Sequence, residues 1–251
     1  MEKDMEYNET RIEGRNAVIE ALKAGRPLDK IYLLKGREDR ALGFIASTAR
    51  AAGIPVTECD RRRLDAMSTT HAHQGVIASA SARSYCEVED ILAVAEQRGE
   101  VPFVVVCDGL EDPRNLGAVI RSAECAGAHG VIISKHHSAG LTAAADKASA
   151  GAAEHMAIAR VANLSAALEL LKERGLWVFG AEADGDAGLW QADLRGPICA
   201  VIGSEGSGIS RLVREHCDSI VSIPLYGKVN SLNASAAASV FLYEIVRQRT
   251  T

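Results

Sequence analysis

The sequence predicts an α/β protein in which a smaller N-terminal α/β module precedes a larger domain built on a parallel sheet. Short β-branched runs alternate with helical stretches along most of the chain, a pattern typical of parallel strands covered by helices. The sequence changes character near Val101, after a polar stretch. We therefore expect an N-terminal module over 11–83, a linker over 84–100 and a doubly wound domain over 101–251.

Five segments define the expected N-terminal module. Apolar residues at helical spacing predict helices over 14–25 and 40–53, and each of these runs ends on a glycine. Short runs rich in β-branched and apolar residues predict strands over 30–34, 54–59 and 75–83.

The larger domain is predicted from five further strand-like runs, interleaved with helical stretches. The polar segment before it has a helical core and is expected to connect the two parts. The predicted strands lie at 102–109, 130–134, 176–183, 198–204 and 219–224.

Charge is distributed unevenly between the two parts. The chain carries a net charge of −5, yet residues 11–83 contain 13 Lys and Arg against 8 Asp and Glu, a balance of +5. The rest of the chain therefore carries −10. Such asymmetry is expected when one part of a protein meets a polyanion.

The composition, 47% hydrophobic and 24% charged, is typical of a globular chain that buries a core. No apolar run reaches about 18 residues, so no membrane-spanning helix is predicted, and the acidic N-terminus is unlike a secretory signal. The six cysteines are dispersed without a CxxC pair. We expect free thiols and a cytoplasmic protein.

Two histidines, His71 and His73, have a spacing that could serve a metal ion. No third ligand of suitable type is close to them in the sequence, so we predict no metal site.

The first of three unusual loops, DGLEDPRNLGAVIRSAECAG at 108–127, follows a predicted strand. Ligands of open parallel sheets bind beyond the carboxyl ends of the strands. Asn115 stands where a helix is expected to begin, and Arg121 follows six positions later.

The other two loops also follow predicted strands. GSEGSGIS at 203–210 contains three glycines and Glu205. Residues 223–233 end in several polar residues, among them Ser231 and Asn233, just before an alanine-rich helix. One such residue would suffice as a helix cap, so several together indicate a ligand site.

The glycine-rich loop does not match the known nucleotide-binding fingerprints. Its sequence fits neither G-x-G-x-x-G nor the phosphate loop, and its acidic residue would repel phosphates. Glycines let the backbone approach a ligand closely. A cradle for a ligand other than a polyphosphate is therefore favoured.

The three loops, with their flanks LEDPRNLGAVIRSAECAG, CAVIGSEGSGISRLV and SIPLYGKVNSLNASAAASV, resemble in order and spacing the three motifs of the SpoU family of RNA ribose 2′-O-methyltransferases, in the SPOUT superfamily. The resemblance extends through GRNAVIEAL and HQGVIA and covers residues 11–249. Within the family, the chain is most similar to the bacterial enzymes that methylate a guanosine of 23S rRNA.

This resemblance implies a trefoil-knotted methyltransferase domain that forms a homodimer, with S-adenosylmethionine as methyl donor. It also implies that the N-terminal module binds rRNA, in agreement with its positive charge. The resemblance implies cofactor contacts at Gly180, Ala181, Gly203, Ile223 and Leu232. Backbone amides and apolar walls suit an adenine, which needs no charged partner.

The resemblance further implies a catalytic group of Asn115, Arg121, Glu205, Ser231 and Asn233. A general-base role for Arg121 remains open. A guanidinium is a donor that is effectively always protonated, so we favour a grip on the adjacent phosphate and stabilisation of the developing alkoxide. Glu205 would orient Arg121 or Asn115, and the remaining two residues would fix the ribose or the loop.

Other hypotheses about the function remain open from the sequence alone. The substrate could be tRNA, or an rRNA position that protects a ribosome from an antibiotic. A non-catalytic RNA-binding protein of this fold would not need the polar residues of the three loops. A nicotinamide oxidoreductase is disfavoured by the missing fingerprint.

Overall fold

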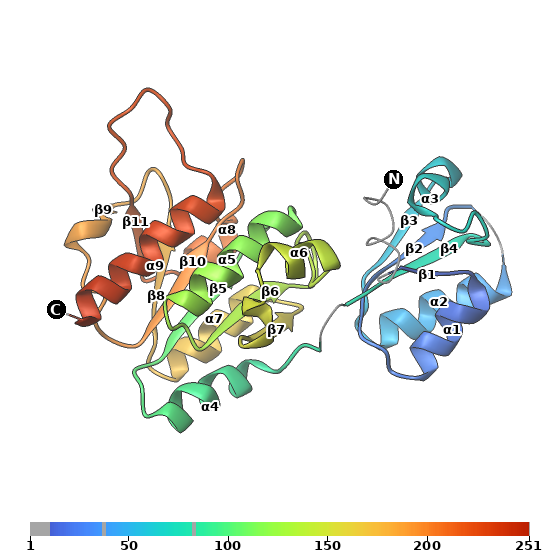
Figure 1. Cartoon of the computed structure of the whole chain (residues 1–251), viewed down its shortest axis with the longest axis horizontal. Helices are drawn as coiled ribbons and strands as arrows, with labels where there is room; N and C mark the ends of the chain where they lie inside the picture. Colours follow the sequence, from blue (N-terminus) through green and yellow to red (C-terminus); the bar gives the residue numbers. More distant parts are fainter. Residues whose placement is uncertain (1–10, 37–38, 82–83, 251) are drawn as a thin grey trace. The chain divides into compact units, whose positions relative to one another are not determined.

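The computed structural model describes residues 11–36, 39–81 and 84–250, and the chain divides into two compact units (Figure 1). The first unit ends at Ser84 and also includes the short segment Gly140–Ala143. The second unit comprises the rest of the chain from Tyr85 onward.

The first unit is a four-stranded mixed sheet in the order β1-β4-β2-β3. Strand β4 runs antiparallel to β1 and β2, whereas β2 and β3 are parallel. Both predicted helices and all three predicted strands are confirmed, and β1 and α3 are additional to them. The elements are β1 (Arg11–Glu13), α1 (Arg15–Lys23), β2 (Leu28–Leu34), α2 (Arg40–Ala51), β3 (Val56–Cys59), α3 (Arg61–Met67) and β4 (Val76–Ala80).

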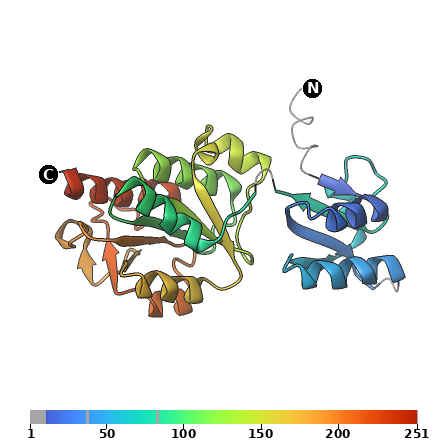
Figure 2. The same cartoon turned by 90° about the horizontal axis from the view of Figure 1, so that it is seen from below.

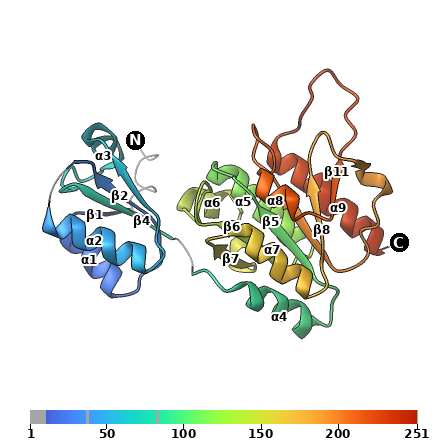
Figure 3. The same ribbon diagram turned by 180° about the vertical axis from the view of Figure 1, so that it is seen from behind.

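Helices cover both faces of this sheet (Figure 3). On one face, Val18 of α1 and Ile45 of α2 join Ile31 of β2 in a buried cluster. On the other face, Leu64 of α3 packs with Ile77 of β4. Burial of apolar area of this kind contributes about 25 cal/mol per Å².

His73, in the loop before β4, has a structural partner on each ring nitrogen. Its Nε2 lies 2.9 Å from Asp65 Oδ1, and its Nδ1 accepts a hydrogen bond from the Gly75 amide at 3.0 Å. The side chain is therefore held in a buried position at the start of β4.

The second unit is a seven-stranded sheet in the order β7-β6-β5-β10-β8-β11-β9, and every neighbouring pair is parallel. The predicted parallel α/β architecture is confirmed, and the five predicted strands are β5, β6, β8, β10 and β11. The elements are α4 (Val88–Arg98), β5 (Phe103–Cys107), α5 (Pro113–Cys125), β6 (Gly130–Ser134), α6 (Ala143–Ala148), η1 (Ala152–Glu154), β7 (Ala157–Val161), α7 (Leu164–Glu173), β8 (Trp177–Ala181), β9 (Ala187–Gly188), η2 (Leu189–Gln191), β10 (Ile198–Ile202), α8 (Arg211–Glu215), β11 (Ser219–Ser222) and α9 (Ala234–Thr250).

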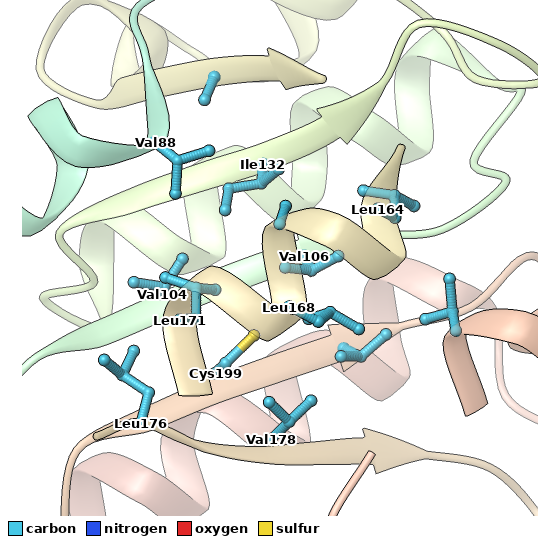
Figure 4. Packing of buried hydrophobic residues seen from close by; sticks show 14 of the residues in the cluster. Val88, Val104, Val106, Ile132, Leu164, Leu168, Leu171, Leu176, Val178 and Cys199 are labelled. Atoms are coloured by element: carbon cyan, nitrogen blue, oxygen red, sulfur yellow. The ribbon is translucent and has the colours of Figure 1, made fainter. Parts of the chain in front are cut away.

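Helices lie on both faces of the parallel sheet (Figure 2). On one face, Val104 and Val106 of β5 pack with Leu168 and Leu171 of α7 (Figure 4). Because side chains of a strand alternate between faces, Val105 points to the opposite face. There α5 and α9 contact each other, and this pair carries two of the three loops that the sequence singles out.

The expected linker, 84–100, is largely an ordered part of the second unit. It contains α4, whose buried residues Val88, Ile91 and Ala95 lie on one helical face and pack within the second unit. Gly130 of β6 illustrates how closely α4 approaches, because a Cβ at this glycine would lie 2.6 Å from Ile91. The polar residues of the segment are its solvent-facing side.

Two strands of the second unit are additional to those predicted. Strand β7 is an edge strand in which Arg160 interrupts the apolar run, and its guanidinium stacks on the Tyr85 ring at 5.4 Å. Strand β9 has only two residues, too few for a sequence signal.

The part of the chain that the structure describes contains no helix with the length and apolar character needed to cross a bilayer. All six cysteines lie within that part and are free thiols, as predicted.

Candidate active site

A cavity opens where β8, β10 and β11 end, which is the edge of a parallel sheet that commonly binds ligands. Its walls come from 181–184, 202–208 and 223–237. Its volume is about 610 Å³, within the range of roughly 300–1,000 Å³ that is typical of small-molecule sites. We call it the first cavity.

The wall of the first cavity contains small and apolar residues beside polar ones. Ala181, Gly203, Ile223 and Leu232 line it, so four of the five expected cofactor residues lie together here. The side chain of Leu232 is 42% exposed. Exposed apolar side chains at a cavity often mark a ligand-binding surface, and a bound ligand would cover this one.

Gly180, the fifth expected cofactor residue, does not line the first cavity. It is buried in β8, and a Cβ at this position would lie 2.7 Å from Ile209 and 2.8 Å from Ile220. This glycine therefore lets the strand pack against its neighbours.

The glycine-rich loop after β10 folds back on itself. The Ser204 amide donates to the Gly208 carbonyl at 2.9 Å, and the Gly208 amide donates to the Ser204 carbonyl at 3.1 Å. A Cβ at Gly203 would lie 2.3 Å from the Gly208 carbonyl carbon, so only glycine fits there. The tight turn exposes backbone to the cavity without a side chain in the way.

Two carboxylates that sequence reasoning missed hold this loop in place. Asp108 accepts a hydrogen bond from the Ser210 amide at 2.6 Å, and Glu182 accepts one from the Ile209 amide at 2.9 Å. Glu182 also pairs with Arg214. Asp108 and Glu182 directly follow β5 and β8, so a sequence signal was present: an acidic residue at the carboxyl end of a strand.

At the rim of the first cavity, Asn115, Glu205 and Asn233 form a hydrogen-bonded group that we call the polar cluster. Asn233 Nδ2 donates to Asn115 Oδ1 at 3.0 Å and to Glu205 Oε1. The three residues come from the three loops singled out in the sequence, and the structure brings them together.

Asn233 also caps helix α9. Its Oδ1 accepts hydrogen bonds from the amides of Ser235 at 3.0 Å and Ala236 at 3.2 Å. An N-cap of this kind stabilises a helix by about 1 kcal/mol. The one amide thus starts the helix through its oxygen and joins the polar cluster through its nitrogen.

The other two expected catalytic residues differ in position. Ser231 lines the first cavity with an exposed side chain. Arg121 is exposed on α5, lines neither this cavity nor its neighbour, and pairs with none of the other described residues. Six positions along an α-helix turn the side chain through about 240° and advance it by about 9 Å, so Arg121 points away from Asn115.

Cys107 at the end of β5 and Cys217 before β11 are poor nucleophiles. Burial raises the pKa of Cys107 to about 12, and the nearby Asp108 charge adds to this effect. Burial likewise raises the pKa of Cys217 to about 12. Both thiols stay protonated near neutral pH, and the thiolate is the nucleophilic form of cysteine.

Among the residues that the structure describes, no group of three or more His, Cys, Asp or Glu side chains could hold a metal ion.

Two protein families match the chain. Residues 102–243 match the SpoU rRNA Methylase family, and residues 11–86 match the family described as RNA 2′-O ribose methyltransferase substrate binding. The chain belongs to the SpoU rRNA methylase family. All three loops of the site lie within the first of these matches.

Two relatives among the SpoU-type proteins cover most of the chain. YacO of Bacillus subtilis, a TrmH family tRNA/rRNA methyltransferase, is 44% identical over 94% of this chain and 94% of its own length. RlmB of Photorhabdus laumondii, a 23S rRNA (guanosine-2′-O-)-methyltransferase, is 45% identical over 88% of this chain and 91% of its own length.

Solved structures also include a SpoU protein of similar fold. The SpoU methyltransferase AviRb from Streptomyces viridochromogenes, in complex with the cofactor AdoMet, is 25% identical and matches with a TM-score of 0.61. The match covers 96% of this chain and 90% of AviRb.

Proposed function

We propose that the protein methylates a ribose 2′-hydroxyl in RNA, with S-adenosylmethionine as methyl donor and a guanosine of 23S rRNA as target. The observation that carries this proposal is the polar cluster, which joins three loops at the rim of the first cavity. The similarity to RlmB and to the AdoMet-bound AviRb supports the target and the donor.

The residues of the first cavity fit S-adenosylmethionine. Ile223 and Leu232 offer apolar walls to an adenine, and Gly203 exposes backbone in a turn that admits no Cβ. When bound, S-adenosylmethionine supplies an electrophilic methyl group on a sulfonium.

The polar cluster binds and orients the ribose. The Glu205 carboxylate and the Asn115 amide oxygen are acceptors for a hydroxyl proton, and Asn233 holds both at one point. Correct placement of reacting groups can lower a barrier by about 7–11 kcal/mol. Ser231, at the wall of the same cavity, fixes the ribose or the loop.

Arg121 acts from the second subunit of a homodimer in this proposal. Its exposed guanidinium points away from the polar cluster of its own chain, whereas a partner subunit could receive it. There it would hold the phosphate next to the methylated ribose and stabilise the developing alkoxide. A permanently protonated guanidinium suits this role better than that of a base.

The N-terminal unit binds the RNA. Arg61, Arg62 and Arg63 are exposed on α3, and the guanidinium of Arg63 lies 5.7 Å from the centre of the Tyr32 ring. The match of residues 11–86 to a substrate-binding family supports this assignment, as does the charge of +5 over 11–83.

The trefoil knot and the cytoplasmic location also belong to the proposal. Strand β10 inserts between β5 and β8, and the segment after β11 returns to Asn115 near β5, an arrangement compatible with a threaded chain. Free thiols are compatible with a reducing cytoplasm.

The test offers labelled S-adenosylmethionine and the purified protein separately to unmodified 23S rRNA, 16S rRNA and bulk tRNA. We expect label in 23S rRNA as 2′-O-methylguanosine, and its loss with Arg121→Ala. If no RNA is labelled, either as free RNA or in ribosomal particles, while the cofactor still binds, the proposal is wrong.

A tRNA substrate is the second candidate, because YacO carries a name that covers both tRNA and rRNA. Label that enters tRNA alone would keep the chemistry and change the substrate.

A further inference from the structure

A second, larger cavity lies beside the first, on the other side of the glycine-rich loop. Its volume is about 1030 Å³, and all of its lining belongs to the methyltransferase unit. Its walls come from 108–115, 134–137, 162–165 and 204–213. A nucleoside with its base fits within such a volume.

The polar cluster stands at the boundary of the two cavities. Glu205 lines both, while Asn115 lines only the second and Asn233 only the first. The hydrogen bond between these two asparagines, 3.0 Å long, therefore crosses the boundary. A methyl group transferred from a cofactor in the first cavity to a ribose in the second would cross the boundary beside this hydrogen bond.

The chemistry of the second cavity differs from that of the first. Its lining contains four carboxylates, those of Asp108, Glu111, Asp112 and Glu205, against one guanidinium, that of Arg211. This charge would repel a run of phosphates. It suits the N–H groups of a nucleobase, which carry partial positive charge and need acceptors.

Glu111 is the carboxylate of this set that has no partner among the residues that the structure describes. Asp108 is occupied by the Ser210 amide, and Asp112 caps α5 by accepting from the Arg114 amide at 2.8 Å. Glu205 belongs to the polar cluster. Glu111 is exposed at the second cavity, four residues beyond the end of β5.

We infer that the second cavity receives the nucleoside whose ribose is methylated, and that Glu111 reads its base as guanine. The inference rests on the proposed function and adds the site and the residue that select the nucleotide. Guanine presents two adjacent donors, N1–H and N2–H, which one carboxylate can accept together. Uracil has one such donor, and adenine and cytosine have an acceptor beside their amino group.

Two imidazole rings complete the site. His136 and His137 are exposed at the same cavity, in the loop after β6. Histidine rings are among the side chains on which unstacked RNA bases stack.

The test compares Glu111→Gln with the wild type in methylation of 23S rRNA and in binding of S-adenosylmethionine by calorimetry. Glutamine keeps the size but replaces one acceptor oxygen by a donor. We expect kcat/KM for RNA to fall about 10- to 100-fold, as for a lost hydrogen bond to a charged group, with cofactor affinity unchanged. Glu173→Gln, at an exposed carboxylate on α7 outside both cavities, is the matched control and should behave as wild type.

Nucleoside analysis of the labelled RNA gives a readout that a merely structural role would not change. With the wild type, label should lie in 2′-O-methylguanosine, and Glu111→Gln should lower this share in favour of other nucleosides. The inference is overturned if Glu111→Gln methylates guanosine at the wild-type rate, if cofactor binding falls in parallel, or if the wild type labels another nucleoside. If the wild type labels no RNA at all, it is the proposed function that fails.

Discussion

The two units of this chain use polar residues in different ways. The N-terminal unit is basic, with 13 Lys and Arg against 8 Asp and Glu over 11–83, and its arginines Arg61–Arg63 are exposed. The methyltransferase unit is acidic, and its polar cluster consists of two amides and one carboxylate at a cavity rim. In the proposed function, net charge collects the RNA on the N-terminal unit, and short directed hydrogen bonds position it on the methyltransferase unit.

The sharpest test of this division concerns Arg121, the one cationic residue expected to act in the acidic unit. Arg121→Ala and Arg121→Lys should both abolish methylation almost completely, since lysine lacks the planar fork of donors. RNA binding, measured by filter retention, should change less than twofold, because the N-terminal unit supplies most of it.

If the protein forms the proposed homodimer, mixed dimers test which subunit supplies Arg121 to each site. When Arg121→Ala and Asn233→Asp chains are mixed, a site that takes its arginine from the other subunit is rebuilt in one of two sites of each heterodimer. About a quarter of wild-type activity should then return. If mixing restores nothing although heterodimers form, Arg121 does not act across the dimer.

Asn233→Asp should have the next largest effect, a loss of about 100- to 1,000-fold in kcat. Aspartate keeps the helix cap but replaces the Nδ2 donor by an acceptor that faces Glu205 and Asn115. The midpoint of thermal unfolding should therefore change little. A stable variant with full activity would show that the polar cluster has no part in the chemistry.

Gly203→Ala should weaken cofactor binding about tenfold, because the added Cβ would overlap the Gly208 backbone and open the turn. Gly196→Ala is the matched control, since a Cβ there meets nothing within 4 Å and the residue lies outside both cavities. Calorimetry with S-adenosylmethionine distinguishes the two. Equal losses in the two variants would show that the tight turn at Gly203 is not what holds the cofactor.

The sequence predicted the residues of the site better than it predicted the strand order and the partner surface around the site, for a physical reason. Ser, Asn, Gly and Glu at strand ends are local signals, so the convergence of Asn115, Glu205 and Asn233 could be expected. The direction of Arg121 follows from helix geometry, but whether a partner receives it depends on a surface outside the single chain. The placement of β10 between β5 and β8 could not be read from periodicity, because alternation gives the faces of a strand but not its neighbours.

Substitution of the three arginines Arg61, Arg62 and Arg63 by alanine should raise the KM for RNA about tenfold and reduce its salt dependence. Cofactor affinity and kcat should stay within twofold. The control replaces Arg26, Arg40 and Arg50, which are also exposed on the N-terminal unit, and so removes the same charge elsewhere. If both triple variants weaken binding equally, total charge and not its position on α3 collects the RNA.

The smallest effect is expected at Glu13, a carboxylate that stabilises the basic unit. It accepts hydrogen bonds from Ser68 Oγ at 2.6 Å and from the Thr69 amide at 2.7 Å. Burial alone would raise the pKa of Glu13, but hydrogen bonds from Ser68, Thr70 and Thr69 outweigh it and lower the pKa to about 2. Because the folded-state pKa is depressed, the ionised carboxylate stabilises the fold at pH values above 4.5, the ordinary pKa, and this contribution is lost as the pH falls towards 2.

Glu13→Gln should therefore lower the free energy of unfolding by about 1 kcal/mol near pH 7. The difference in unfolding free energy between wild type and variant, measured in urea titrations, should narrow between pH 4.5 and 3. A gap that does not change with pH would assign the effect of Glu13 to packing and not to its charge.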